Sequence, residues 1–234
     1  MISPWCLCYL VCTKFYQNKV IFLRLTHIPW RELKYALWLP LYLLAFVLVE
    51  HLPQTSYWPT QLTLDNAIPF CEWFVLFYCT WYPLLVAVGL YLLLRDAPAF
   101  RHYMAFLAVT FFASIVIWLL LPNGQDLRPQ AFPRENFSTA LVAALYCIDT
   151  NTNVFPSVHV VGSVGAALAV WDSPRLRAQP LLRWGVVLLA ALICVSTLFI
   201  KQHAILDVVS GLVLSLAVAV PLYLIPWKRT KNLP

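Results

Sequence analysis

The chain has 234 residues, of which 62% are hydrophobic and only 11% are charged. A soluble globular domain carries about 25% charged residues, so this composition excludes an ordinary soluble protein and predicts an all-α integral membrane protein. The length suits one compact helical domain, and the formal net charge of +6 has to be explained by where the basic residues lie.

The first 34 residues mix short apolar runs with basic residues, which are Lys14, Lys19, Arg24, Arg31 and Lys34. The apolar runs are interrupted too often for a clear membrane span. No small-residue cleavage site follows them, which argues against a signal peptide. We expect residues 1–34 to form an interfacial or loosely ordered cytoplasmic arm. A first span before residue 13 or over residues 15–28 is the alternative.

Six hydrophobic segments follow, each close to the roughly 17–25 residues with which a helix crosses a bilayer. They cover residues 35–52, 71–94, 104–122, 156–172, 184–201 and 203–225. Trp and Tyr gather near the segment ends, as they do where membrane helices meet the interface. We therefore predict a six-helix membrane bundle over residues 35–225, followed by a basic cytoplasmic tail at 226–234.

The lysines and arginines predict the orientation, because cytoplasmic loops of membrane proteins are enriched in them. With the N-terminus inside, all of them except Arg128, Arg134 and Lys201 fall on the cytoplasmic side. The basic charge is thus a topology signal and does not indicate nucleic-acid binding. It predicts a multi-pass protein with both termini in the cytoplasm, in the plasma or inner membrane if the source is bacterial. Residues 123–155 and 201–203 then lie on the non-cytoplasmic face.

One polar cluster on that face opens the fourth segment with Pro156-Ser157-Val158-His159. Proline suits the first turn of a helix, and the polar run at 149–153 offers capping side chains. First-turn N–H groups and the positive end of a helix dipole form a site for anions. Ser157 adds a hydroxyl and His159 a titratable group. The plainer interpretation is a capped helix whose histidine only packs.

A second cluster, Lys201, His203 and Asp207, lies between the last two segments. Ionisable residues at membrane depth are costly unless they are paired, so they are candidates for function. On a helix, the i,i+4 spacing would place the Asp207 carboxylate one turn from the His203 imidazole. That contact would fix the tautomer and leave the other ring nitrogen free. The alternative is a His–Asp pair that only caps a helix junction.

Arg128, in the loop before these clusters, adds a planar cation suited to bidentate contact with phosphate. Two histidines, a carboxylate, two cations and a helix N-terminus on one face indicate phosphate chemistry. One histidine can attack phosphorus while the other protonates the leaving oxygen. No cluster of Asp, Glu or Cys indicates a metal, and we expect neither a metal nor a cofactor.

These residues resemble the signatures of the type 2 phosphatidic acid phosphatase superfamily of membrane lipid phosphatases and phosphotransferases, which are K-x6-R-P, P-S-x-H and S-R-x5-H-x3-D. The cluster at 156–159 matches the second signature in full, and Arg128-Pro129 matches the end of the first. The third is matched by Ser196, His203 and Asp207. The resemblance covers roughly residues 35–225.

The resemblance implies a role for each matching residue. His203 would be the nucleophile that forms a phosphohistidine, and Asp207 would orient it. His159 would be the general acid. Arg128 would hold phosphate oxygens, and Ser157 would contribute its hydroxyl and backbone N–H.

Two positions depart from the family pattern, because the first-signature Lys falls on Leu121 and the third-signature Arg falls on Thr197. Lys201 lies four residues after Thr197, hence on the same face if that helix continues, and we expect its ammonium to replace the missing Arg. Asn123 or Gln125 would partly replace the missing Lys. The alternative for Lys201 is an interfacial lysine that extends its charge toward water.

We therefore expect a metal-independent enzyme that hydrolyses a lipid phosphomonoester or diphosphate at the non-cytoplasmic face of the bilayer. A polyprenyl diphosphate or phosphatidic acid would fit as substrate. The nearest alternative is a phosphotransferase similar to inositol phosphorylceramide synthase, which passes the phospho group to a hydroxyl acceptor. The second is a non-catalytic membrane protein of the same fold. No residue separates hydrolase from transferase or indicates the oligomeric state.

Overall fold

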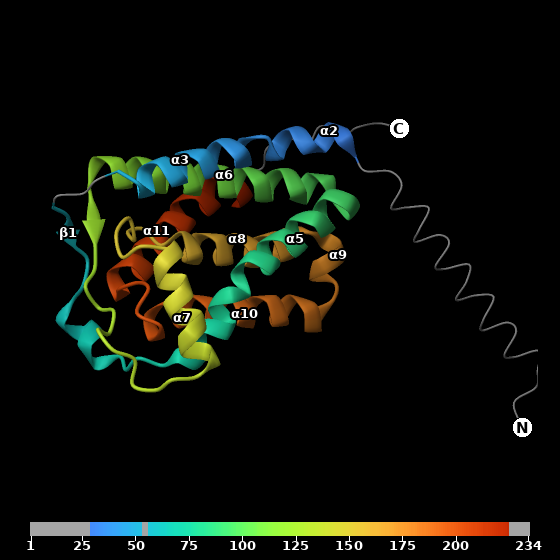
Figure 1. The fold of residues 1–234 in the computed structure, drawn as a ribbon. Coiled ribbons are helices and arrows are strands. Elements are labelled where there is room, and N and C mark those ends of the chain that lie inside the picture. Colours follow the sequence, from blue (N-terminus) through green and yellow to red (C-terminus); the bar gives the residue numbers. More distant parts are fainter. Residues whose placement is uncertain (1–28, 53–55, 225–234) are drawn as a thin grey trace, which may run out of the picture.

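A computed structural model describes residues 29–52 and 56–224. The predicted arm at 1–34 lies outside the described residues up to residue 28, and the predicted tail at 226–234 lies wholly outside them. The described chain is a bundle of helices (Figure 1). The helices are α2 (Trp30–Leu33), α3 (Trp38–Glu50), α4 (Val75–Cys79), α5 (Trp81–Arg95), α6 (Ala97–Leu120), α7 (Phe137–Ile148), α8 (Val158–Asp172), α9 (Pro174–Arg177), α10 (Pro180–Phe199) and α11 (Ile205–Ala219).

Short elements connect these helices. Three 3-10 turns, η1 (Lys34–Ala36), η2 (Thr63–Ala67) and η3 (Glu72–Phe74), precede or join them, and a π-helical turn, η4 (Val220–Leu224), extends α11. Two-residue strands β1 (Trp58–Pro59) and β2 (Asn123–Gly124) pair in parallel, with Trp58 opposite Asn123. The parallel pair fastens the segment before α4 to the segment after α6.

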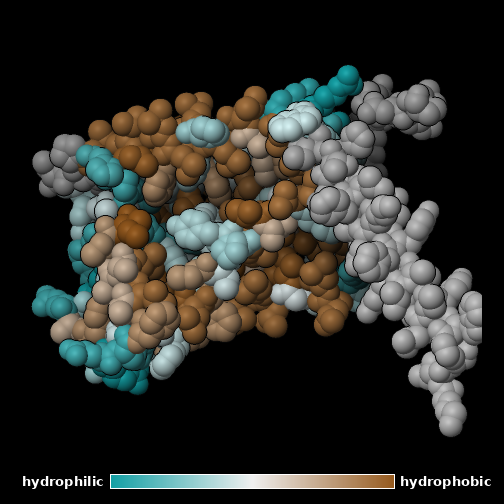
Figure 2. Space-filling view, turned by 45° about the vertical axis from the view of Figure 1, so that its right-hand side comes forward, coloured by the Kyte–Doolittle hydropathy of each residue, from teal (hydrophilic) through white to brown (hydrophobic). Residues whose placement is uncertain are grey.

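Within the described residues, five continuous stretches are long and apolar enough to cross a membrane: Trp30–Glu50, Glu72–Arg95, Ala97–Leu120, Pro180–Phe199 and Ile205–Leu224. Apolar side chains cover much of the flank of the molecule, and hydrophilic residues gather toward its two ends (Figure 2). The predicted helical membrane bundle is confirmed. The fourth predicted segment forms as α8, which is shorter than the other five, so a count of six spans stays a prediction.

Helix α8 lies at the centre of the bundle and packs against α5, α6, α10 and α11. Its small residues permit this, as expected for membrane helices that approach closely. A Cβ on Gly162 would lie 2.7 Å from the indole nitrogen of Trp81, and one on Gly165 would lie 2.9 Å from the ring of Phe106. On α11, a Cβ on Gly211 would lie 2.9 Å from Val160. The start of α8 is thereby held among its neighbours.

The region 123–155, for which no helix is predicted, contains α7. Asn136 caps this helix, because its side-chain oxygen accepts a hydrogen bond of 3.0 Å from Thr139 N–H. The same side chain donates from Nδ2 to Glu72 at 3.0 Å, which ties the start of α7 to η3. An apolar stretch of 12 residues is too short to span a bilayer, and for this reason it did not register as a membrane segment.

The described basic residues divide between the two ends of the bundle. Arg128, Arg134 and Lys201 lie at the end where α8 and α11 begin. The others lie at the opposite end, where α6 and α10 begin, or on the short helices next to it: Arg31, Lys34, Arg95, Arg101, Arg175, Arg177 and Arg183. This separation agrees with the charge pattern of a membrane protein. Which end faces the cytoplasm stays a prediction.

Candidate active site

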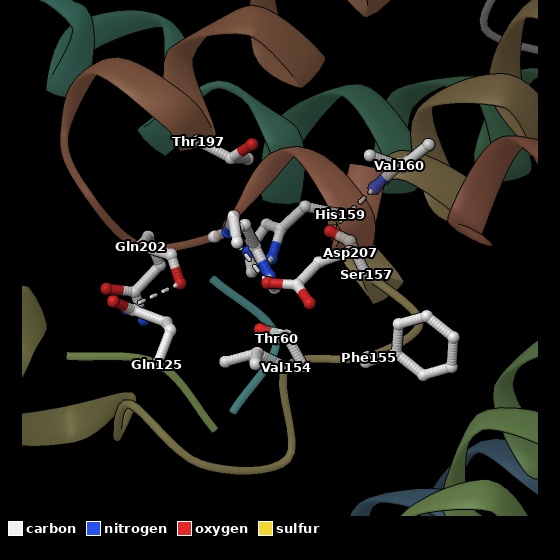
Figure 3. A network of polar contacts seen from close by, with 12 residues as sticks. Thr60, Gln125, Val154, Phe155, Ser157, His159, Val160, Thr197, Gln202 and Asp207 are labelled. Atoms are coloured by element: carbon white, nitrogen blue, oxygen red, sulfur yellow. Dashed lines mark hydrogen bonds and ion pairs between the residues drawn. The ribbon is translucent and has the colours of Figure 1, made fainter. Parts of the chain in front are cut away.

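The three predicted clusters meet at one end of the bundle, around the start of α8 and the junction between α10 and α11. Figure 3 shows Ser157, His159 and Asp207 drawn together, with Gln125 and Gln202 beside each other nearby and Thr197 standing apart. The side chains of His159, His203 and Asp207 are almost completely buried. Residues from α8 and from the α10–α11 junction therefore share one enclosed polar site.

The two histidines face each other. Nε2 of His203 lies 3.4 Å from Nδ1 of His159. The imidazole of His159 is also held between two aromatic rings, with its centroid 4.3 Å from that of Tyr78 and 4.5 Å from that of Trp81. Its Nε2 is buried and has no hydrogen-bond partner among the described residues. The nitrogen that faces His203 is therefore the one directed at the polar site.

Asp207 lies behind His203, with 3.6 Å between its Oδ2 and Nδ1 of the imidazole. The predicted pair is thus brought together, but not by one helix as expected. His203 precedes α11, and Asp207 lies in its first turn, where Oδ2 accepts a hydrogen bond of 2.7 Å from Ala204 N–H. The carboxylate caps the helix and approaches the imidazole with the same oxygen.

Ser157 is the N-cap of α8, since its Oγ accepts a hydrogen bond of 3.4 Å from Val160 N–H. Two expectations are therefore wrong: the polar run at 149–153 does not cap α8, and Pro156 precedes the helix and is not part of its first turn. The backbone N–H of Ser157 donates to the carbonyl oxygen of Asp207 at 3.1 Å. That bond joins α8 to α11 directly beneath the two histidines.

Arg128 is next to this site and is bound to the residues that frame it. Its guanidinium donates to the carbonyl oxygens of Tyr146 (3.2 Å) and Asp149 (2.6 Å) and to Oε1 of Gln202 (2.9 Å). It also stacks over the Tyr146 ring at 4.2 Å. Burial lowers the pKa of Arg128 from its usual range, and the Asp149 carboxylate opposes that effect. Its Nε is buried and has no hydrogen-bond partner within 29–52 and 56–224.

Lys201 does not occupy the place expected for a replacement cation. Helix α10 ends at Phe199, so it does not continue to Lys201, which has a left-handed φ of 54°. The ammonium donates to the carbonyl oxygens of Asp65 (2.9 Å) and Ile68 (2.6 Å). Burial lowers the pKa of Lys201, and the Asp65 carboxylate acts in the opposite direction. The expectation of a helix that continues through 201 is wrong.

The residues expected to replace the missing first-signature lysine also have structural partners. Asn123 accepts hydrogen bonds from the backbone N–H groups of Val154 (2.9 Å) and Phe155 (2.8 Å). Gln125 donates to the carbonyl oxygens of Lys201 (3.0 Å) and Gln202 (3.3 Å). Both amides therefore hold backbone segments around the site.

Sequence reasoning missed three polar contributors. Tyr78 lies against His159, Asp149 accepts the Tyr78 hydroxyl hydrogen bond at 2.7 Å, and Asp65 accepts a hydrogen bond of 2.8 Å from Ile205 N–H at the start of α11. No local pattern marks Tyr78, which sits in an apolar run 81 residues before His159. Asp65 and Asp149 stand in polar loops, where a carboxylate is usually only solvated. Among the described residues, no group of three or more His, Cys, Asp or Glu is arranged to hold a metal ion.

Comparison with known proteins gives one match. The model of the PAP2 superfamily matches residues 103–231, which is more than half of the chain and includes all three predicted clusters. No curated protein and no solved structure matches significantly. Members of this superfamily are generally phosphatases or phosphotransferases. A helical membrane bundle with paired histidines at 159 and 203 agrees with that assignment, and the chain belongs to the PAP2 superfamily.

Proposed function

We propose that this protein hydrolyses a lipid phosphomonoester or diphosphate by way of a phosphohistidine at His203. The observation that carries the proposal is the approach of His203 Nε2 to within 3.4 Å of His159 Nδ1, with Asp207 behind the nucleophile. A proton on Nδ1 of His203, directed at Asp207, leaves the lone pair of Nε2 free for attack.

The reaction has two steps. In the first, Nε2 of His203 bonds to phosphorus, the bond from phosphorus to the lipid oxygen breaks, and His159 gives its proton to that oxygen. In the second, His159 takes a proton from water, the resulting hydroxide oxygen bonds to phosphorus, and the P–N bond breaks to release phosphate. The carboxylate of Asp207 stabilises the charge that forms on the His203 ring. A phosphoryl group that enters this site has to part the two rings.

Arg128 and Ser157 are the groups proposed to contact the phosphate oxygens. The Nε–H of Arg128 is buried and unpaired among the described residues, so this guanidinium keeps one donor for an anion. The hydroxyl hydrogen of Ser157 is available, because Oγ accepts rather than donates in its cap. Lys201 is not proposed as a phosphate ligand, since its ammonium is bound to the segment at 65–68.

The lipid nature of the substrate is supported by the membrane bundle around the site. An apolar chain could lie along the flank of the helices while its phosphate reaches the end of the bundle, at the face proposed to be non-cytoplasmic. A polyprenyl diphosphate or phosphatidic acid has this form. The protein would thus act on lipid phosphates within the bilayer without a metal or a cofactor.

A phosphotransferase is the second candidate, and the substitutions at Leu121 and Thr197 favour it. Thr197 is neutral and adds no charge to the site. Its hydroxyl donates to the carbonyl oxygen of Cys194 at 2.8 Å. A less cationic site suits a phosphate that bears less negative charge, such as a diester, whose phospho group would pass to a hydroxyl acceptor. The same phospho-His203 would form in both reactions.

The first test is phosphate release by the purified protein in detergent, from a panel of lipid mono- and diphosphates, with EDTA present. We expect release from at least one lipid in the wild type and its loss in His203→Ala and His159→Ala. Release that disappears with EDTA would overturn the metal-free mechanism. Wild-type activity in His203→Ala would overturn the phosphohistidine. Turnover that requires an added lipid or sugar alcohol would identify a transferase, and no turnover with either would support a non-catalytic protein.

A further inference from the structure

Tyr78 and Asp149 form a polar connection to His159 that none of the family signatures includes. The Tyr78 side chain is completely buried, and its hydroxyl lies 2.7 Å from Oδ2 of Asp149 and 3.5 Å from Nδ1 of His159. Tyr78 also lies outside the residues matched by the family model. The chain therefore supplies this contact from α4, a helix that precedes the matched region.

The two distances determine the direction of the hydrogen bonds. A carboxylate only accepts, so the short contact commits the single hydroxyl proton of Tyr78 to Asp149. The phenol oxygen can then only accept from His159, which requires a proton on Nδ1. Nδ1 is also the nitrogen that faces Nε2 of His203. The nitrogen directed at the reacting phosphate is thus the one that Tyr78 keeps protonated.

Burial and the neighbouring His203 disfavour a positive charge on His159, so its protonated state depends on the polar groups that face it. Tyr78 faces it from α4 and His203 from the α10–α11 junction, while Asp207 lies behind His203 and Asp149 lies beyond Tyr78. Arg128 holds the backbone carbonyl of Asp149, which keeps that carboxylate in reach of the phenol. Trp81 closes the remaining side with an aromatic face. A charged imidazole at this buried position needs a partner, and the Tyr78–Asp149 pair provides one.

We infer that Tyr78 is a positioning residue that links the Asp149 carboxylate to His159 and extends to higher pH the range over which His159 can act as the acid. The inference rests on the proposed role of His159. It assigns a function to α4 and to the residue after α7, neither of which carries a family signature.

The test compares Tyr78→Phe with Tyr82→Phe in the purified protein. Tyr78→Phe keeps the ring against His159 and removes only the hydroxyl, whereas Tyr82 is an exposed tyrosine one turn away that packs on Trp81. For Tyr78→Phe we expect kcat for phosphate release to fall about tenfold with little change in KM, as part of the 10²–10⁴ contribution of general acid catalysis. The pH at which kcat falls on the alkaline side of its pH profile should decrease by about one unit. Tyr82→Phe should match the wild type.

Asp149→Asn provides a second variant, because asparagine can still accept the Tyr78 hydroxyl but carries no charge. Asp149→Asn should likewise shift the alkaline fall of kcat to lower pH. The Tyr78→Phe/Asp149→Asn double variant should show no further shift, since both changes break the same connection to His159. A purely structural role would reduce the amount of folded protein without moving the profile. A Tyr78→Phe profile that superimposes on the wild type would overturn the inference.

A readout independent of turnover separates this inference from the proposed function. Nuclear magnetic resonance of the ¹⁵N-histidine-labelled protein in detergent reports the protonation of the buried His159 ring as a function of pH, with His159→Ala to assign its signal. The neutral form should appear at lower pH in Tyr78→Phe than in the wild type or Tyr82→Phe. Identical pH dependence in all three would reject the connection even if phosphate is released. A shift in a protein that releases no phosphate would retain the connection and reject the proposed reaction.

Discussion

The ammonium of Lys201 donates a hydrogen bond of 2.9 Å to the carbonyl oxygen of Asp65. The carboxylate of Asp65 in turn accepts hydrogen bonds from Leu62 N–H (2.7 Å) and Ile205 N–H (2.8 Å). These contacts fasten the segment at 62–68 to both sides of His203. That segment lies before the residues matched by the family model, so the turn at His203 is held in part by residues outside the match.

Replacement of Lys201 by Met should destabilise the protein and lower kcat while changing KM little. The change removes the Lys201 donor from the carbonyl oxygen of Ile68 and leaves that of Asp65 with only the longer hydrogen bond from Ile68 N–H (3.3 Å). A hydrogen bond to a charged group contributes about 1.5–3 kcal/mol. Thermal unfolding in detergent and steady-state kinetics measure the two effects. Arg175→Met, at an exposed position at the other end of the bundle, is the control. A large rise in KM with unchanged stability would instead restore Lys201 as a phosphate ligand.

Asp65→Asn should lower kcat about tenfold, although residue 65 touches neither histidine. Asparagine retains one acceptor and turns an NH₂ group toward a backbone N–H, so one of the two buried bonds to Leu62 and Ile205 is lost. The expected cost is about 1–3 kcal/mol of unfolding free energy, together with a displaced start of α11. Differential scanning fluorimetry and phosphate release test this. Asp126→Asn, whose partner Tyr57 lies on the exposed rim, should behave as the wild type in both assays.

Asp207→Asn should abolish most of the activity and leave the fold intact. Its side-chain oxygen can still cap α11 through Ala204 N–H, but the charge next to Nδ1 of His203 is gone. We expect kcat to fall by about 10²–10⁴, a range typical of a lost acid–base group. Trapping of ³²P-labelled protein at acid-quenched time points would show less phosphohistidine than in the wild type. Equal labelling in both proteins would contradict the role of Asp207.

Two glycines provide a matched test of the packing that holds α8. Gly162→Ala places a methyl group 2.7 Å from Trp81, and overpacking of this kind costs about 1–3 kcal/mol. Because Trp81 lies against His159, the variant should also lose activity. Gly185→Ala meets nothing within 4 Å, so it should be neutral or slightly stabilising, as expected for alanine in a helix. Equal thermal midpoints for the two variants would refute this account.

Much of the fold could be predicted from hydrophobic length alone. Apolar runs of near-bilayer length mark membrane helices because an unpaired backbone is not tolerated in hydrocarbon. Helix α7 was missed because its apolar stretch is short and its stability comes from the Asn136 cap and its contacts with η3. His203 and Asp207 lie close together as predicted, but not on one helix, since α11 begins only at Ile205.

Part of the candidate site could be predicted from the sequence. His159, His203, Asp207 and Ser157 carry recognisable residue types at recognisable spacings, and the tertiary structure brings them together. The position of the Lys201 side chain could not be predicted because it depends on where α10 ends, and one left-handed residue turns the side chain toward 65–68. Side-chain direction at a helix end is set by contacts that the local sequence does not encode.

The sequence by itself determined the membrane class, the helical bundle, the family and the paired histidines, because these follow from apolar length and from residues at short, regular spacings. Only the tertiary structure decided which nitrogen of each histidine faces the other, that Lys201 binds Asp65, and that Tyr78 contacts both Asp149 and His159. These contacts join residues from 44 to 136 positions apart. Their geometry depends on how whole helices pack, which no local pattern specifies.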